Sequence, residues 1–342
     1  MPITKCYICR ENIDLPHPQY SYLCLKCGDE NLAYKNATID LSGYTALVTG
    51  GRIKIGYHTA LRLLRSGAKV IVTSRFPHSM VTTYKNEADF SEWKDRLYFY
   101  GLDLLRIDMI EEFINEIYNS FGSLDILINN AAQTIKDNTA EEEQAAIEAS
   151  ISNKVKNCED LVQWQLPGPV RLNQLAVLGK TAIDGNVENA WVKLSTDVSL
   201  KDLLETQIVN VVAPYLLSTS FKPLLEESRN KNKFLINVSS LEGKFDVKSK
   251  SPAHPHTNMA KAALNMMTKT FANEYKRSSI FVYSVDPGWV SDQFPDDGRI
   301  KRDLPLTFDD AAARLTHPIF TWKDADKPPT GIFLKDYSQT GW

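Results

Sequence analysis

Four of the five cysteines follow a spacing that suits metal binding. Cys6 and Cys9 form one C-x-x-C pair, and Cys24 and Cys27 form a second pair after fourteen intervening residues. Two tight turns of this kind can present four thiolates tetrahedrally around one Zn²⁺, and with every position taken by protein the metal would be structural. Two disulfides or a redox pair are the alternatives, and both are rarer in a reducing compartment. The spacing therefore predicts a structural zinc site.

The segment that carries these cysteines is short. Residues 1–40 are too few to bury a hydrophobic core, which is a reason for them to need a metal. His17 is expected in a loop, although a histidine could replace one cysteine ligand. Four aromatic residues could pack this segment on the main domain or dock a partner: Tyr7, Tyr20, Tyr22 and Tyr34. We expect a zinc-ribbon-like module at 1–40 and a larger domain at 41–342.

A glycine-rich stretch at residues 45–56, TALVTGGRIKIG, is suited to binding phosphate. Gly50, Gly51 and Gly56 allow a tight turn and a close approach of a pyrophosphate, while the following helix offers unpaired N–H groups at its N-terminus. The spacing is G-G-x-x-x-x-G rather than G-x-G-x-x-G, so a plain strand-to-helix turn is the alternative. We interpret the stretch as the phosphate loop of a dinucleotide site.

The end of the next predicted strand, AKVIVTS at 68–74, bears on the choice of cofactor. In dinucleotide-binding folds an acidic residue there accepts from the ribose 2′-OH of NAD, whereas a basic residue accommodates the 2′-phosphate of NADP. Ser74 and Arg75 occupy this place, and Arg52 is also available. The pattern favours NADP(H) over NAD(H), with a solvated loop charge at Arg75 as the alternative.

Strands and helices that alternate along the chain must position these residues. One predicted strand is the apolar run that opens the stretch 45–56, and the others are 68–74, 97–102, 125–128, 234–238, 280–285 and 332–334. Amphipathic helices are predicted between them, including one that Gly67 closes and a long one from Leu200. This alternation indicates an α/β fold with a doubly wound parallel sheet of the Rossmann type, which binds ligands at the carboxyl ends of its strands.

An insertion at about 135–205 is far longer than an ordinary connection in such a fold. Because it leaves the carboxyl end of a strand, it could form a substrate lid or a subunit contact, or be a surface excursion.

Composition excludes several classes of protein. The net charge of -3 and the pI near 6.1 argue against a nucleic-acid binder, which needs a basic face. The sequence contains no apolar run that could span a membrane and no apolar signal segment at its start. We therefore expect a cytoplasmic protein without membrane or nucleic-acid partners.

Several motifs in the expected order resemble the short-chain dehydrogenase/reductase family. They are T-G-G-x-x-x-x-G at 49–56, Asp103-Leu104, N-N-A-A at 129–132, Asn210, the serine pair ending at Ser240, Lys261 and Pro287-Gly288. The glycine loop, the end of the second strand and the family resemblance together imply a set of cofactor-binding residues. They are Thr49, Gly50, Gly51, Arg52, Ile55, Gly56, Ser74, Arg75, Asp103, Leu104, Asn130, Ala131, Ala132, Lys261, Pro287 and Gly288. The zinc module lies outside the family pattern.

The resemblance also implies catalytic roles. Ser240 would hydrogen-bond the substrate oxygen, Asn210 would hold a water in the proton relay, and Lys261 would hold the nicotinamide ribose. The family's general acid is a tyrosine four residues before the lysine, where this chain has Thr257. A threonine hydroxyl has no useful pKa for acid–base catalysis.

Two histidines beside this position could replace the acid. His256 or His254 could take over proton transfer, since imidazole titrates near neutral pH. Alternatively, Thr257 is only the N-cap of a helix and both histidines are solvated. Lys54 stands where the family has its middle glycine, and there it could crowd or contact a pyrophosphate.

The sequence thus predicts an NADP(H)-dependent oxidoreductase acting on a carbonyl or alcohol, with His256, His254 or a relayed water as proton donor. The alternative is a pseudoenzyme that binds NADP(H) and engages a protein partner through the zinc module or the insertion. A homo-oligomer is expected by analogy with the family. Zinc-mediated nucleic-acid binding fits the cysteines but not the acidic balance.

Overall fold

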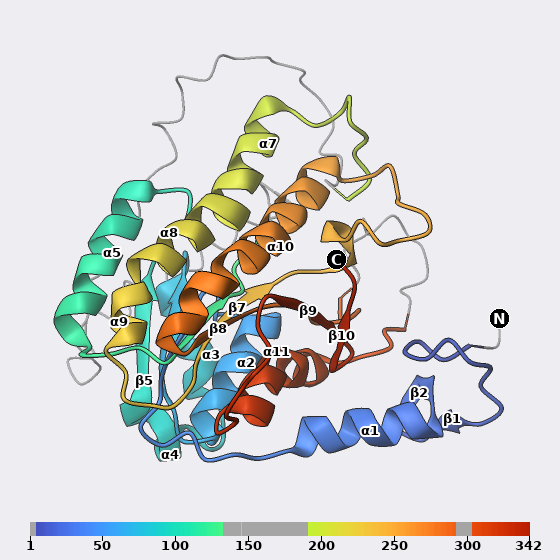
Figure 1. The fold of residues 1–342 in the computed structure, drawn as a ribbon, viewed down its shortest axis with the longest axis horizontal. Helices are drawn as coiled ribbons and strands as arrows, with labels where there is room; N and C mark the ends of the chain where they lie inside the picture. The colour runs from blue at the N-terminus through green and yellow to red at the C-terminus, as the bar shows by residue number, and fades with distance from the viewer. Residues whose placement is uncertain (1–4, 133–144, 146–190, 292–302) are drawn as a thin grey trace.

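An eight-stranded sheet forms the centre of the computed structural model, which describes residues 5–132, 145, 191–291 and 303–342 (Figure 1). Across the sheet the strands are β10 (Ser338–Thr340), β9 (Ile332–Lys335), β8 (Ile280–Asp286), β7 (Lys233–Val238), β6 (Ile126–Asn129), β3 (Thr45–Val48), β4 (Lys69–Ser74) and β5 (Leu97–Gly101). Neighbouring strands are parallel except β9 and β10. The predicted doubly wound sheet is confirmed.

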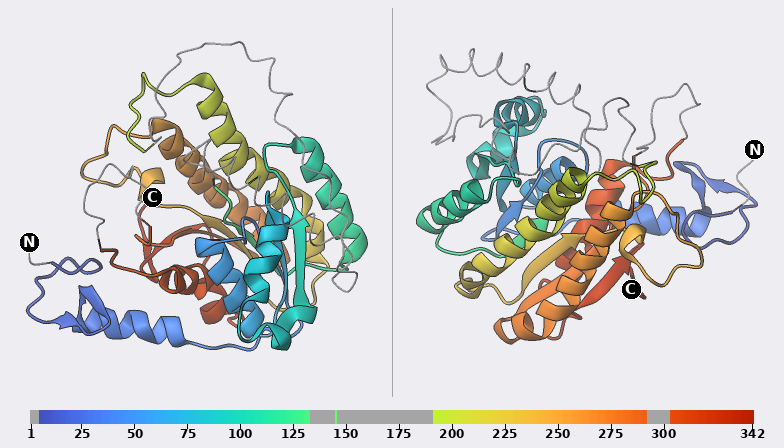
Figure 2. Two further views of the ribbon diagram at one scale, coloured as in Figure 1. Left: turned by 180° about the vertical axis from the view of Figure 1, so that it is seen from behind. Right: turned by 90° about the horizontal axis from the view of Figure 1, so that it is seen from above.

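Helices cover both faces of this sheet (Figures 1 and 2). One face packs against α2 (Lys54–Arg65), α3 (Pro77–Lys85) and α11 (Phe308–Trp322). The other packs against α5 (Ile107–Ser120), α8 (Ala213–Ser220) and α10 (Pro255–Tyr275). Continuous with α8 are α7 (Leu200–Gln207) and a π-helical turn, η2 (Ile208–Val212). Short helices are α4 (Phe90–Trp93), η1 (Lys94–Arg96), α9 (Lys222–Glu226), η3 (Leu241–Gly243) and η4 (Lys276–Ser278).

The central strands are mainly apolar because both of their faces are buried. In β3, Ala46 and Val48 pack into the core on the α2 side, whereas Leu47 packs into the core on the α5 side. Successive side chains of a strand point to opposite faces, so a strand covered on both sides needs an unbroken apolar run. This requirement explains why the central strands could be found from sequence.

The N-terminal module is a hairpin followed by a helix. Strands β1 (Pro16–His17) and β2 (Tyr20–Cys24) pair antiparallel, and α1 (Leu25–Asn36) follows directly. A helix was not part of the ribbon expected here. The prediction of a loop at His17 is wrong, because His17 lies in β1 and is buried. Its imidazole lies against Gly28, where a Cβ would come within 2.3 Å of the ring.

Most of the predicted insertion at about 135–205 lies outside the described residues, and so does its proposed lid. Its described end, from residue 191, leads into α7. Among the described residues, no helix is both long and apolar enough to cross a bilayer.

Candidate active site and metal centre

The predicted cofactor residues lie at one edge of the sheet. Each group lies at or just after the carboxyl end of a strand. These groups are residues 49–56 after β3, 74–75 at the end of β4, 103–104 after β5, 130–132 after β6 and 287–288 after β8. Because these strands are parallel, their carboxyl ends share this edge. β3 has β4 on one side and β6 on the other, which makes it the switch point where such sheets bind ligands.

The glycine loop is clamped from the end of β6. The side-chain amide of Asn130 donates to the carbonyls of Thr49, at 2.9 Å, and Gly50, at 3.2 Å. The Thr49 hydroxyl accepts from the backbone N–H groups of Asn130 and Ala131, both at 3.0 Å. A Cβ on Gly56 would lie 2.2 Å from the Gly50 carbonyl oxygen. The loop therefore requires glycine at position 56.

Lys54 adopts the backbone conformation that its position demands. Its φ is +55°, in the left-handed region that favours glycine. Lys54 therefore keeps a backbone conformation that a glycine at this position would adopt readily. The Lys54 side chain is exposed at the first residue of α2, beside the loop that would hold the pyrophosphate.

Two arginines flank one aromatic ring at the end of β4. The guanidinium carbon of Arg52 lies 5.3 Å from the centroid of the Phe76 ring, and that of Arg75 lies 5.5 Å from it. The hydroxyl of Ser74 accepts a hydrogen bond from the Phe76 N–H at 3.0 Å. Charges from two different loops therefore converge where an adenosine ribose would lie.

Asp103 and Leu104 close the neighbouring loop. The Asp103 carboxylate accepts from the N–H of Leu105 at 3.0 Å, and its carbonyl accepts from the N–H of Arg106. Leu104 is buried against the α5 side of the sheet. Ile55, half-buried in α2, packs against the opposite core.

Ser240 and Lys261 come from the loop after β7 and from α10. Ser240 is half-buried, and its hydroxyl forms no hydrogen bond with the described residues. The preceding serine, Ser239, instead donates to Asn265 at 2.7 Å. Lys261 Nζ is buried and donates to the carbonyl of Val238 at 2.7 Å. Burial lowers the Lys261 pKa to about 8.

Asn210 lies in the π-helical turn between α7 and α8 and is 1% exposed. Pro214, four residues later, has no N–H for the Asn210 carbonyl, and the N–H of Ala213 bonds instead to Ile208, five residues back. The wider turn is therefore explained by the proline. The sequence contained this signal, since Pro214 follows a predicted functional asparagine at the spacing of one helical turn.

Sequence reasoning missed a buried polar ladder that joins the site's elements. Asn129 donates to Ser218 and Asn237, Asn237 donates to Thr268, and Thr268 bonds Ser284 at 2.8 Å. These contacts link β6, β7 and β8 to α8 and α10. Polar residues inside apolar strands were the available signal, because a buried polar group needs a partner.

Comparison with known proteins decides the family. The model described as short chain dehydrogenase matches residues 44–167, and the model described as Enoyl-(Acyl carrier protein) reductase matches 175–303. An uncharacterized protein of Acanthamoeba polyphaga mimivirus is 35% identical over 347 residues, covering 94% of this chain and 72% of that protein. The chain belongs to the short-chain dehydrogenase/reductase (SDR) family of oxidoreductases.

Two further likenesses agree with this placement. (+)-Neomenthol dehydrogenase of Capsicum annuum is 26% identical over 254 residues, 72% of this chain and 71% of that protein. The crystal structure of NADPH bound carbonyl reductase from chicken fatty liver superimposes with a TM-score of 0.59 at 19% identity, covering 90% of this chain and all of that one. At this identity the structural likeness shows the SDR fold.

Thr257, four residues before Lys261, lies in the first turn of α10. It is 2% exposed, and its Oγ1 has no hydrogen-bond partner among the described residues. The alternative that Thr257 is an N-cap is wrong, because α10 begins at Pro255 and is capped by His254. Proline suits the first turn of a helix because it lacks an N–H that would be unpaired there.

The two histidines are buried rather than solvated, which corrects the other half of that alternative. His254 Nδ1 lies 2.9 Å from the carbonyl oxygen of Trp191, and the two rings lie 4.4 Å apart. Burial raises the pKa of Asp202 in α7, but hydrogen bonds from Lys193 and Ser199 and the nearby charge of His256 hold that pKa below its usual value. His256 therefore lies toward α7.

The loop after β8 is held from several sides. The N–H of Gly288, whose φ is +86°, donates to Asp286 Oδ1 at 2.8 Å. Lys335 Nζ lies 3.2 Å from the other oxygen of Asp286. The backbone N–H of Trp289 donates at 2.9 Å to the hydroxyl of Tyr7, a residue of the N-terminal module. Pro287 itself is buried.

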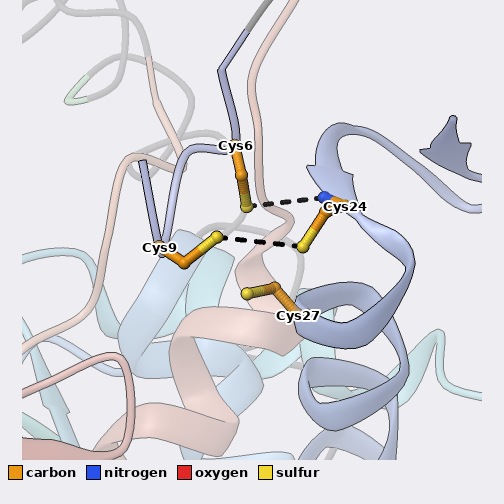
Figure 3. A group of neighbouring side chains, drawn as sticks. All are labelled: Cys6, Cys9, Cys24 and Cys27. Carbon is orange, nitrogen blue, oxygen red and sulfur yellow. Dashed lines mark hydrogen bonds between the residues drawn. The ribbon is translucent and has the colours of Figure 1, made fainter. Parts of the chain in front are cut away.

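The four cysteines converge as predicted (Figure 3). Their sulfurs lie within 4.8 Å of one another, and Cys9 Sγ and Cys24 Sγ are 3.8 Å apart. Tetrahedral Zn–S bonds of about 2.3 Å place sulfurs about 3.8 Å apart, whereas a disulfide needs about 2.0 Å. All four thiols are free, so the donor set fits a metal better than two disulfides. His17 is not part of the cluster.

The module docks on α11 through buried polar groups. The Tyr20 hydroxyl and the Asn31 amide both donate to Asp310 Oδ1, at 2.7 and 2.9 Å. Arg314 donates to Asn31 Oδ1 at 2.8 Å, and both Asp310 and Arg314 are buried. Tyr34 stacks on Tyr337, with ring centroids 4.1 Å apart. Tyr7, Tyr20 and Tyr34 therefore pack the module on the main domain, one of the two roles expected for them.

Proposed function

We propose that this SDR protein is an NADP(H)-dependent oxidoreductase that interconverts a carbonyl and an alcohol. The observation that carries the cofactor choice is the pair of arginines, Arg52 and Arg75, around Phe76 at the end of β4. Guanidinium groups bind phosphate through charge-assisted hydrogen bonds, and no acidic residue stands at the end of β4 to accept from a 2′-OH. The NADPH-bound chicken carbonyl reductase supports the same choice.

The close-packed loop around Gly50, Gly56 and Asn130 fits a pyrophosphate, because it brings backbone and the start of α2 to one point. Bound NADP(H) would supply the hydride chemistry. Lys261 would turn from the Val238 carbonyl to the nicotinamide ribose. The Ser240 hydroxyl, which has no partner among the described residues, would hold and polarise the substrate oxygen.

The proton source we propose is Lys261, acting through a water held by the Thr257 hydroxyl. The two residues are one helical turn apart on α10 and both are buried. A lysine with a pKa of about 8 can donate a proton near neutral pH. His254 is already engaged with Trp191, and His256 lies toward α7, so neither histidine is the better candidate.

Direct titration tests the cofactor assignment. We expect the metal-loaded protein to bind NADPH more tightly than NADH, and Arg75→Ala to weaken NADPH binding about tenfold to a hundredfold, since an ionic hydrogen bond contributes about 1.5–3 kcal/mol. NADH binding should change little, which makes it the internal control. Equal affinity of the unmutated protein for both cofactors would refute the choice of NADP(H).

A pseudoenzyme that binds NADP(H) without turnover is the second candidate, and Thr257 in place of tyrosine is the observation that favours it. A screen of carbonyl substrates with NADPH separates the two candidates. Oxidation of NADPH that Ser240→Ala abolishes establishes the enzyme. NADPH binding with no turnover on any carbonyl establishes the pseudoenzyme.

We further propose that the cysteine cluster holds a structural Zn²⁺. Cys6, Cys9, Cys24 and Cys27 supply a complete tetrahedral donor set, which leaves no position for a substrate. Metal analysis of the purified protein should give one zinc per chain. Replacing Cys9 and Cys24 by serine should abolish that content, and a metal content unaffected by this double change would refute the site.

A further inference from the structure

Two of the contacts between the N-terminal module and the main domain have different consequences. One is α11, where the buried groups of Asp310 and Arg314 anchor α1. The other is the loop after β8, at residues 287–290, which lies at the same edge of the sheet as the glycine loop. The resemblance to the SDR family implies that the backbone of this loop contacts the nicotinamide end of the cofactor, so the module borders a proposed cofactor-binding loop.

Tyr7 makes the direct contact with this loop. Its hydroxyl accepts the N–H of Trp289 at 2.9 Å, and Lys335, which is paired with Asp286, lies 5.6 Å from the centroid of its ring. Val290 packs in one apolar cluster with Cys6, Leu23 and other residues of the module. The backbone and a side chain of the loop are therefore both held by the module.

Tyr7 is itself placed between two of the four cysteines. It follows Cys6 and precedes Cys9 by two residues, and its own N–H donates to the Tyr22 carbonyl at 2.8 Å. A metal shared by the two cysteine pairs would tie this turn to the start of α1, which α11 anchors. That link would add to the hydrogen bonds from the backbone N–H groups of Cys6 and Tyr7 to Glu11 and Tyr22, and to the packing of Cys6 in the apolar cluster.

On the basis of the NADP(H) site proposed above, we propose that the module positions the nicotinamide-end loop of the active site. The metal fixes Tyr7, and the Tyr7 hydroxyl fixes the backbone at Trp289. Tyr7 is thus a positioning residue, and metal loading controls the affinity for the intact dinucleotide. The adenosine end of the site, built from Arg52, Arg75 and Ser74 at β3 and β4, is independent of this link.

Tyr7→Phe tests this proposal, because it removes only the hydroxyl. In the metal-loaded protein we expect the Kd for NADPH to rise about threefold to tenfold, as one lost hydrogen bond implies. The Kd for adenosine 2′,5′-bisphosphate, which has the 2′-phosphate but no nicotinamide, should not change. Tyr22→Phe is the matched control, since the Tyr22 hydroxyl forms no hydrogen bond with the described residues and both affinities should stay as they were.

Removing the metal with a chelator should raise the Kd for NADPH in the unmutated protein. In Tyr7→Phe the same treatment should raise the Kd for NADPH only slightly further. A Tyr7→Phe protein that binds NADPH with unchanged Kd, or that loses both ligands equally, overturns the proposal while the cofactor assignment stands. An unmutated, metal-loaded protein that binds no NADPH overturns the cofactor assignment, and this proposal with it.

Discussion

One side chain that departs from the expected SDR pattern is the threonine at position 257 on α10. Thr257 cannot titrate near neutral pH, yet it is buried beside Lys261, whose pKa burial lowers to about 8. In the family pattern a lysine assists a phenol, whereas we propose that Lys261 itself supplies the proton here. Our proposal therefore moves the acid–base role from position 257 to position 261.

Lys261→Arg should separate charge from proton transfer. Arginine keeps the positive charge for the cofactor ribose but does not release its proton. We expect turnover to fall about a hundredfold or more, the usual contribution of general acid catalysis, with a smaller rise in the Kd for NADPH. Stopped-flow oxidation of NADPH measures the turnover, and fluorescence titration measures the Kd for NADPH. Undiminished turnover would show that another group donates the proton.

The pH profile of carbonyl reduction provides an independent check. An acid must be protonated to donate, so the rate should be constant below pH 8 and fall as pH rises through the Lys261 pKa of about 8. Cofactor affinity should weaken in the same range, because the charged amine is the form that holds the ribose. His256→Gln should leave the profile in place. A decline centred near pH 6.5 that His256→Gln removes would identify the histidine as donor.

At the scale of elements, the candidate site includes an irregular turn within a long helix. The π-helical turn η2 places Asn210 between α7 and α8, and Pro214 explains it by removing one α-helical hydrogen bond. Asn210 is buried under the same helices that the polar ladder ties to β6 and β7. The local irregularity is therefore held by regular elements on both sides.

Pro214→Ala restores the missing N–H and should favour a regular α-helix through Asn210. A regular turn would rotate Asn210 away from its present direction, and small misplacements of catalytic groups can cost up to about a hundredfold in rate. We expect kcat to fall about tenfold or more while the Kd for NADPH stays the same. Pro223→Ala, at the start of α9, is the matched control and should leave kcat unchanged. Equal kcat in both variants would contradict a role for the turn.

The elements that could be predicted from sequence are those whose buried residues recur at a regular period. The central strands and the amphipathic α2 and α5 bury apolar side chains in a period that sequence reveals. Helix α1 has the polar sequence LKCGDENLAYKN and is held by Asn31 against Arg314, a long-range contact without periodicity. β10 follows a turn in which Asp336 and Tyr337 have φ of +48° and +65° although neither is glycine. These features depend on tertiary contacts.

The candidate site could be predicted to a similar extent. Family spacing selects Ser240 and Lys261 as candidate site residues, and the fold selects Arg75 at the end of β4; these assignments stay predictions. The sequence does not predict the hydrogen bond between the Trp289 N–H and the Tyr7 hydroxyl, because the two residues are 282 positions apart. Nor does it predict the buried orientation of His254, which depends on Trp191 at the end of the inserted segment.

For the molecule as a whole, the module and the main domain share one buried seam. His317 of α11 lies in it, with Tyr34 of the module on one side, at 5.0 Å, and Tyr337 on another, at 5.3 Å. His317 is 6% exposed, and burial lowers its pKa to about 4. No acidic side chain is paired with this imidazole in the described structure. Protonation of His317 would therefore weaken both the attachment of the module and the stability of the fold.

The sign of this effect follows from proton uptake on unfolding. Between pH 6.5 and 4 the unfolded chain binds a proton at His317 that the folded chain does not, so stability is highest above pH 6.5 and is lost as pH falls toward 4. The expected loss between pH 7 and 5 is about 2 kcal/mol in the free energy of unfolding. Urea denaturation at several pH values measures it.

His317→Phe should flatten this dependence, because the ring remains and the titrating group is gone. Acid also releases metal from thiolates, so the comparison is made between variants at equal pH and zinc content. His58→Gln is the control, since His58 is partly exposed and bonds Asp309 at 2.7 Å on the surface of α2. If His317→Phe loses stability between pH 7 and 5 as steeply as the unmutated protein, acid sensitivity arises elsewhere, and the seam does not link protonation to the attachment of the module.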